Sequence, residues 1–152
     1  MPTNSARLAE LGISLPAVAA PLAAYVPAVR TGSLVYTSGQ LPLVDGELTS
    51  TGKVGAEVSP EDAYRCARNC ALNALAAIDA LVGIDSVVRV VKVVGFVAAD
   101  PAFTAVPQVV NGASELLGEV FGDAGRHARS AIGVAVLPRD VPVEVELVVE
   151  VA

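Results

Sequence analysis

Aromatic side chains are scarce in this sequence. They make up 4% of its 152 residues, tryptophan is absent, and only 17% of the residues are charged. A typical soluble domain has about 25% charged residues. Hydrophobic residues nevertheless reach 53%, so the apolar content comes mainly from alanine and valine. A chain this apolar is not expected to be disordered. Its length predicts one domain, residues 1–152, whose core needs no disulfide or metal for stability.

Basic residues are also few. Ten lysines and arginines stand against sixteen acidic residues, which gives a formal net charge of -6 and an isoelectric point near 4.6. A protein that binds the phosphates of a nucleic acid needs a basic surface. The charge balance therefore argues against a nucleic-acid partner.

Long hydrophobic runs are missing. The longest, residues 87–99, contains Arg89 and Lys92 and is too short to cross a bilayer. The start of the chain also lacks the basic and apolar segments of a signal peptide. These observations predict a cytoplasmic protein with no membrane partner. Because the chain has more apolar side chains than a small domain needs, we expect apolar surface to be buried between subunits.

Cysteine and histidine are rare as well. Cys66 and Cys70 are four residues apart, on one predicted helix face, without a CxxC spacing or a neighbouring histidine. We interpret them as buried thiols in a reducing compartment, and we predict no metal site and no cofactor. His127, the single histidine, lies in a glycine-rich segment, residues 122–128, and we interpret it as a surface loop residue.

The N-terminal part of the chain is predicted to form an arm. Residues 3–11 have the pattern of a short helix that stops at Gly12. Residues 16–24 are rich in proline and alanine and predict an irregular segment. Residues 1–24 are therefore treated as an N-terminal helical arm that precedes the main fold.

Five segments have the alternation or the β-branched composition of strands, namely residues 25–30, 34–38, 87–98, 129–136 and 143–151. The first two flank a Thr-Gly-Ser turn and predict a hairpin. The third is apolar on both faces, which is typical of a strand covered on two sides. A loop is predicted between residues 44 and 58.

Two long helices complete the pattern. Ser59 is the predicted N-cap of the first helix, with Pro60 at its first position and Gly83 at its end. The second helix is predicted over residues 105–121 and ends at Gly122. The order β-β-α-β-α-β-β predicts an α+β fold in which one sheet carries both long helices on one face.

One face of the predicted strand 129–136 combines a cation with small residues, Arg129, Ala131, Gly133 and Ala135. Such a face forms a shallow recess with a guanidinium at its rim. Because both helices are assigned to the other face of the sheet, we expect a second copy of the sheet to cover this one. The small-residue face is thus predicted to lie in a subunit interface.

Arg129 and Glu144 are the strongest candidates for chemistry. A guanidinium at the start of an apolar strand can bind a carboxylate through two parallel hydrogen bonds, or it can simply reach solvent at the strand end. Glu144 lies on the last strand, which is expected to run antiparallel beside the Arg129 strand. It can orient or deprotonate a water molecule, or it can be one of several solvent-facing acids.

Four further positions carry weaker signals. Ser38 and Gly39 end a predicted strand, where a glycine allows a ligand to approach the backbone closely, although the signal by itself favours a plain turn. Asn111 can contact a ligand or lie on a solvated helix face. Tyr25 can pack its ring or offer its hydroxyl group.

Two blocks of the sequence resemble the YjgF/RidA family of reactive-intermediate imine deaminases. The first is Tyr-Thr-Ser-Gly-Gln-Leu-Pro at residues 36–42, and the second begins Ala-Arg-Ser at residue 128 and ends with Glu-Val-Glu at residue 146. The N-terminal arm is similar to the branch labelled YjgF-like endoribonuclease or L-PSP-like. The resemblance implies a chorismate-mutase-like fold and a homotrimeric barrel, with a ligand cleft at each subunit interface.

The resemblance also implies roles for residues. Arg129 matches the arginine that holds a substrate carboxylate, and Glu144 matches the acid that positions the attacking water. The other matching positions bind the ligand through side chain or backbone, and they are Tyr25, Ser38, Gly39, Asn111 and Ala131. Ala131 stands where a cysteine is often found, which leaves a backbone role and removes a thiol role.

The implied activity is hydrolysis of small 2-imino acids to 2-keto acids and ammonia, without a cofactor. The alternative is a non-catalytic trimer that binds a small carboxylate metabolite or a protein partner, as the arm and Ala131 suggest. A third hypothesis, ribonuclease activity, comes from the name of the branch. The net charge of -6 and the few aromatic residues argue against it.

Overall fold

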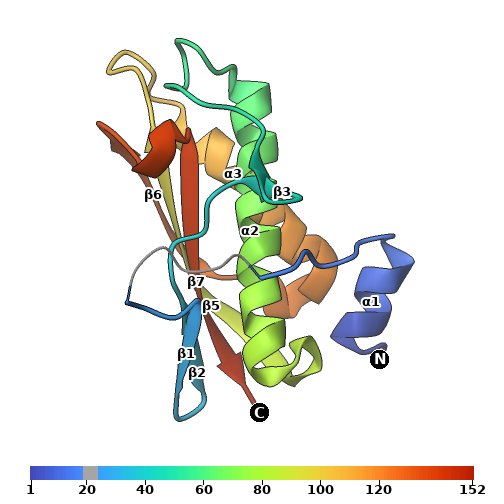
Figure 1. The fold of residues 1–152 in the computed structure, drawn as a ribbon. Coiled ribbons are helices and arrows are strands. Elements are labelled where there is room, and N and C mark those ends of the chain that lie inside the picture. Colours follow the sequence, from blue (N-terminus) through green and yellow to red (C-terminus); the bar gives the residue numbers. More distant parts are fainter. Residues whose placement is uncertain (19–23) are drawn as a thin grey trace.

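The computed structural model describes residues 1–18 and 24–152, and residues 19–23 of the predicted irregular segment lie outside them. Within the described residues, five strands form one sheet and two form a separate hairpin, while the three α-helices lie on one side of the sheet (Figure 1). The elements in chain order are α1 (Asn4–Glu10), β1 (Ala28–Thr31), β2 (Leu34–Thr37), β3 (Leu43–Val44), β4 (Glu47–Leu48), α2 (Pro60–Val82), η1 (Ile84–Ser86), β5 (Val87–Ala98), α3 (Val106–Phe121), η2 (Gly122–Gly125), β6 (Ala128–Val134), η3 (Pro138–Asp140) and β7 (Val143–Val151).

This order confirms the predicted α+β fold. Most boundaries lie within two residues of those expected, but β1 begins only at Ala28, three residues after the predicted start, because Pro27 precedes it. The predicted loop 44–58 contains most of the short β3–β4 hairpin, which the sequence analysis missed because each of its strands has only two residues.

The helix ends follow the expected capping chemistry. The Ser59 side chain accepts a hydrogen bond from the backbone N–H of Asp62 at 3.1 Å, and a proline occupies the first turn of α2. Gly83 ends α2 with a φ of 81°, a left-handed conformation that glycine adopts without strain. Gly122 ends α3 in the same region, with a φ of 60°.

The strand order is β1-β2-β7-β5-β6, with β5 and β6 parallel and the other pairs antiparallel. This order corrects one expectation: β7 does not lie beside β6, because β5 pairs with both strands and separates them. The short turn 137–142 therefore carries the chain across β5 instead of closing a hairpin. Arg129 pairs in register with Val93, and Glu144 pairs with Phe96.

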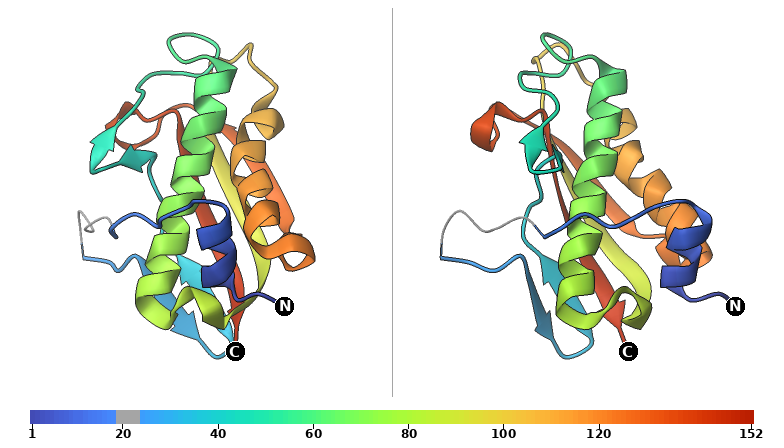
Figure 2. Two further views of the ribbon diagram at one scale, coloured as in Figure 1. Left: turned by 90° about the vertical axis from the view of Figure 1, so that its right-hand side faces the viewer. Right: turned by 45° about the vertical axis from the view of Figure 1, so that its right-hand side comes forward.

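The two faces of the sheet differ in cover. The odd-numbered side chains of β7 are buried beneath the helices, which lie in front of the strands in the left view of Figure 2. The opposite face, called the open face here, carries the even-numbered residues of β7 and exposed apolar side chains at Val29, Tyr36 and Ile132. Apolar side chains in such a patch indicate an interaction surface.

The predicted small-residue face is the second correction. Arg129 and Ala131 point toward α3, not toward the open face, because Ala131 packs against the core and pairs with Gly95, which lies under Val110 of α3. Gly133 likewise faces Val106 of α3. Small residues on this side of β6 thus make room for a helix of the same chain.

Helices α2 and α3 approach each other most closely at Gly112. A Cβ atom at this position would overlap with the backbone carbonyl oxygen of Tyr64 on α2. The core between them is built largely of alanine, valine and leucine, with Leu75, Ile78, Leu116 and Leu117 among its largest fully buried side chains. Helices and strands that pack this closely leave little room for aromatic rings, which agrees with the low aromatic content of the chain.

The predicted helical arm is present as α1, and it is anchored to the end of the sheet. The Asn4 amide donates hydrogen bonds to the backbone oxygens of Ile84 and Val87 at 2.9 and 3.1 Å. The backbone N–H and hydroxyl of Ser5 both donate to the Asp85 carboxylate at 2.7 Å, which lowers the pKa of Asp85. These contacts hold α1 beside α3 and η1, on the side of the helix layer that faces away from the sheet (Figure 2).

Candidate functional site

Arg129 leaves the edge strand β6 toward α3. Its Nη1 donates hydrogen bonds to Asn111 Oδ1 at 2.8 Å and to Ser114 Oγ at 3.2 Å. Both acceptors are neutral, and none of the ion pairs among the described residues involves Arg129. A guanidinium has five N–H donors, so donors remain for the carboxylate of a ligand.

His127 takes part in the same network. Its Nε2 lies 2.9 Å from Ser114 Oγ, and its Nδ1 lies 2.6 Å from the backbone oxygen of Gly125. His127 lies in a loop, as predicted, but its side chain is only partly exposed and both of its nitrogens have partners. The short 3-10 helix η2 turns the loop back toward α3 and brings the imidazole to Ser114.

Glu144 is half-buried on the open face, at the start of β7. Burial of the side chain, and after it the negative charge of Glu146, raise the pKa of the Glu144 carboxyl above its ordinary value. A raised pKa suits a group that must both accept and return a proton near neutral pH. The electrostatics of Glu144 therefore suit a general base.

Gly39 leaves the space that the Glu144 carboxylate occupies. A Cβ atom at Gly39 would lie 2.8 Å from Glu144 Oε1. The neighbouring Gln40 bridges to Val145 through two backbone hydrogen bonds of 2.8 and 3.1 Å, which fix the segment after β2 beside β7. The Gly39 backbone and the Glu144 carboxylate therefore lie side by side.

Ser38 and Tyr25 lie beside Gly39 and Glu144. The Ser38 hydroxyl donates a hydrogen bond of 2.6 Å to the backbone oxygen of Val26, so its oxygen can still accept one from a ligand. Tyr25 is 50% exposed and lines the same cavity as Gly39. Of the predicted residues, these two therefore belong with Gly39 and Glu144, in the segments that precede β1 and follow β2.

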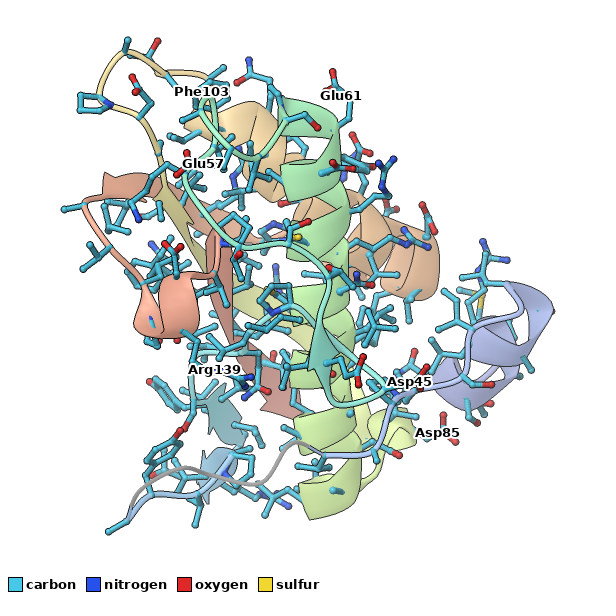
Figure 3. All side chains as sticks on the ribbon, turned by 45° about the horizontal axis from the view of Figure 1, so that its top comes forward. Asp45, Glu57, Glu61, Asp85, Phe103 and Arg139 are labelled. Atoms are coloured by element: carbon cyan, nitrogen blue, oxygen red, sulfur yellow. The ribbon has the colours of Figure 1, made fainter. Side chains whose placement is uncertain are left out.

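A cavity of about 420 Å³ opens next to Tyr25 and Gly39. It is bounded by residues 16–18 of the arm and by Asn73 of α2. Its rim includes Asp45, in the turn of the β3–β4 hairpin, and Arg139 of η3, both labelled in Figure 3.

The predicted site residues therefore fall into two groups. Arg129, Asn111 and Ala131 lie on the helix-covered side at the β6 edge, while Glu144 and Gly39 lie on the other side of β7, with Ser38 and Tyr25 beside them at the end of β2. Side chains of adjacent strand residues alternate between faces, and β5 lies between Arg129 and Glu144. One chain does not bring the cation and the acid together.

Ser114 is a site residue that sequence reasoning missed. It lies on α3 three residues after Asn111, and residues three apart share a helix face. That spacing could have identified it as a second partner for Arg129. The partnership with His127 had no comparable signal, because it depends on the path of η2.

The thiols play no part in either group. Cys66 and Cys70 are buried in α2, and burial raises the pKa of both. This agrees with their interpretation as structural residues. Among residues 1–18 and 24–152, no group of histidine, cysteine or acidic residues has the arrangement to hold a metal ion. In the same residues, no helix combines the length and the apolar character that a bilayer span requires.

Comparison with known proteins gives consistent matches over nearly the whole chain. Residues 5–151 match the family described as "YjgF/chorismate mutase-like, putative endoribonuclease". The protein TCP17 of Trypanosoma cruzi is 46% identical over 148 residues, which is 96% of this chain and 92% of that protein.

Two solved structures extend the comparison. A "putative endoribonuclease" from Shewanella oneidensis has a TM-score of 0.94 and 34% identity, covering 99% of this chain and 100% of that one. E. coli TdcF with bound serine has a TM-score of 0.65 and 26% identity, covering 91% of this chain and 96% of that one.

Proposed function

The chain belongs to the YjgF/chorismate mutase-like family, and from this premise we propose that it hydrolyses small 2-imino acids to 2-keto acids and ammonia. The observation that carries the proposal is the surroundings of the Arg129 guanidinium. This side chain is a partly buried cation that is held by two neutral side chains and is free of ion pairs among the described residues. Such a cation suits a small ligand that brings its own carboxylate.

The reaction needs only a positioned substrate and an activated water. Water adds to the electrophilic carbon of the C=N bond, and a proton passes to the nitrogen, which gives a tetrahedral carbinolamine. Loss of ammonia from this carbon leaves the 2-keto acid. An enamine such as 2-aminoacrylate enters the reaction after tautomerising to its imine, so 2-aminoacrylate and water give pyruvate and ammonia.

Arg129 would fix the carboxylate next to the reacting carbon and so present one face of the C=N bond to the water. Glu144 would take a proton from that water and return it to the departing nitrogen. The raised pKa of Glu144 supports this role, because the carboxyl then exchanges a proton at a smaller energetic cost than an ordinary glutamate near neutral pH.

The separation of the two groups within one chain makes association of copies part of the proposal. A cleft between two subunits would combine Arg129, Asn111 and Ala131 of one copy with Tyr25, Ser38, Gly39 and Glu144 of the next. Repetition of this contact around a threefold axis gives a homotrimer. The exposed apolar side chains of the open face supply surface for it.

The match to E. coli TdcF with bound serine supports a small ligand with a carboxylate, since serine has one. The alternative function is a trimer that binds a small carboxylate without turning it over. Ala131 is the observation that favours it, because this position has no side chain able to take part in proton transfer.

Imine hydrolysis is tested with 2-aminoacrylate generated in place by a dehydratase, with pyruvate release followed over time. The protein is expected to accelerate release, and Arg129→Ala to lower kcat/KM by about 100-fold or more. Arg129→Lys is expected to keep part of the activity, because it keeps the charge but not the bidentate geometry. Acceleration that is equal with Arg129→Ala would exclude the proposed site.

Pyruvate binding measured by calorimetry separates the alternative from the proposal. Binding that depends on Arg129, without acceleration of imine hydrolysis, would select the non-catalytic function. The family description also mentions an endoribonuclease. The site gives no support to RNA binding, because Glu144, Glu146 and Glu150 place negative charge along the open face of β7.

A further inference from the structure

The candidate carboxylate-binding arginine is the end of a chain of hydrogen bonds that starts at a backbone carbonyl. The chain runs from the Gly125 oxygen to His127, from His127 to Ser114, and from Ser114 to Arg129, with distances of 2.6, 2.9 and 3.2 Å. Ser114 lies on α3, His127 follows η2, and Arg129 lies on β6. Three separate elements therefore meet at one guanidinium.

The direction of each hydrogen bond follows from the chemistry of its ends. A backbone carbonyl only accepts, so His127 Nδ1 must carry a proton and donate it to Gly125. In the neutral imidazole, Nε2 is then the acceptor, and the Ser114 hydroxyl donates its proton to it. This leaves the lone pairs of Ser114 Oγ facing Arg129 Nη1, which can only donate.

We propose that His127 and Ser114 are positioning residues that orient Arg129 for a ligand carboxylate. His127 sets the direction of the Ser114 hydroxyl, and the Ser114 oxygen together with Asn111 Oδ1 holds Nη1 on the side of α3. The remaining N–H groups then face away from these two acceptors. The inference rests on the proposed function, since it assigns to Arg129 the role of binding the carboxylate.

A first experiment examines the network in the free protein. Since His127 is the single histidine of the chain, the imidazole nitrogen resonances belong to this residue, and only Nδ1 and Nε2 have to be distinguished. In the neutral imidazole, a protonated Nδ1 and an unprotonated Nε2 are expected. Ser114→Ala is expected to speed the rotation of the Arg129 guanidinium. The opposite tautomer, or rotation that Ser114→Ala leaves unchanged, would overturn the inference.

A second experiment measures pyruvate binding by calorimetry. Ser114→Ala and His127→Asn are expected to weaken binding about 5- to 10-fold. The first removes an acceptor of the Arg129 guanidinium, and the second removes the acceptor that orients the Ser114 hydroxyl. Asparagine keeps a donor for Gly125 but loses the acceptor for Ser114. Two conservative variants are expected to bind nearly as tightly as the wild type. Ser114→Thr keeps the hydroxyl group, and His127→Gln keeps an acceptor near the position of Nε2.

A double-mutant cycle separates positioning from a merely structural role. In the Arg129→Ala background, Ser114→Ala is expected to cause no further loss of binding, because Ser114 acts through Arg129. Equal losses in both backgrounds would contradict the inference. Ser33→Ala, in the exposed β1–β2 turn, serves as the matched control, and thermal unfolding verifies that each variant folds.

The two experiments fail in different ways. If the wild-type protein neither binds pyruvate nor hydrolyses 2-aminoacrylate, the proposed function is wrong, but the imidazole tautomer and the guanidinium rotation still decide whether the network orients Arg129. If the protein binds and turns over its substrate while the variants bind as tightly as the wild type, the proposed function stands and the positioning role is wrong.

Discussion

At the scale of single residues, Glu144 has a charge that its surroundings disfavour. Its pKa is raised by burial and by the charge of Glu146. Glu146→Gln removes the second cause, so the pKa of Glu144 falls and the acid limb of the pH profile of kcat/KM is expected to move to lower pH. Glu150→Gln, on the same face of β7, is the control. Equal shifts in both variants would exclude a specific effect of Glu146.

Gly39 provides a second prediction at this scale. Gly39→Ala places a Cβ atom 2.8 Å from the present position of Glu144 Oε1, so the carboxylate must move. Because the displaced atoms are the end of a flexible side chain, the melting temperature is expected to change little. We expect kcat for imine hydrolysis to fall about 10- to 100-fold, since small errors of position weaken acid–base catalysis. An unchanged kcat would show that catalysis does not depend on the position that Gly39 allows the Glu144 carboxylate to take.

At the scale of elements, the contact between α2 and α3 depends on one glycine. Alanine ordinarily stabilises a helix interior over glycine by about 1 kcal/mol. At Gly112 the added methyl group would overlap with the Tyr64 carbonyl oxygen, so Gly112→Ala is expected to lower the free energy of unfolding by about 1–3 kcal/mol. Gly118, on the same helix, faces open space, and Gly118→Ala should stabilise the protein. Urea denaturation of both variants checks the opposite signs.

At the scale of the whole molecule, the position of Arg129 and Glu144 on opposite faces predicts complementation. Arg129→Ala and Glu144→Gln are each expected to abolish most activity. When the two variants are refolded together, roughly a quarter of the interfaces should pair an intact Arg129 with an intact Glu144 and recover activity in that proportion. If mixing restores nothing while the subunits exchange, each site is built within a single chain.

The open face gives a further prediction at this scale. Ile132, an apolar residue of β6, is 42% exposed on the open face of the sheet. If copies of the chain associate through this face, Ile132→Asp should yield a smaller species in sedimentation, because an unpaired charge in an interface is costly. Leu81→Asp, at an exposed apolar position of α2, should not. An unchanged sedimentation coefficient for Ile132→Asp would place the interface elsewhere.

Local pattern accounts for most of what could be predicted. Ser59, Pro60 and Gly83 mark the ends of α2 because capping is chemistry within one turn of helix. The alternation along β7 likewise follows from the pleat of a strand. Arg129 and Glu144 became candidates through their places on the predicted strands, and the family resemblance then implied their roles.

Strand order was beyond the reach of local pattern. A short turn normally joins neighbouring strands, yet Arg139 and Asp140, both with left-handed φ angles of 57° and 58°, lie in a turn that carries the chain past β5. The same lack of long-range information led the small side chains of β6 to be assigned to the face without helices, although they lie on the side that α3 covers.

The amino-acid order alone was enough to predict the helices and the five strands of the main sheet, their sequence along the chain and the chemical groups available to a site, since these depend on neighbours within a few residues. The tertiary structure was needed to show that β5 separates Arg129 from Glu144 and that His127 reaches Arg129 through Ser114. Both arrangements depend on pairings between residues that are distant along the chain, and side-chain periodicity does not encode such pairings.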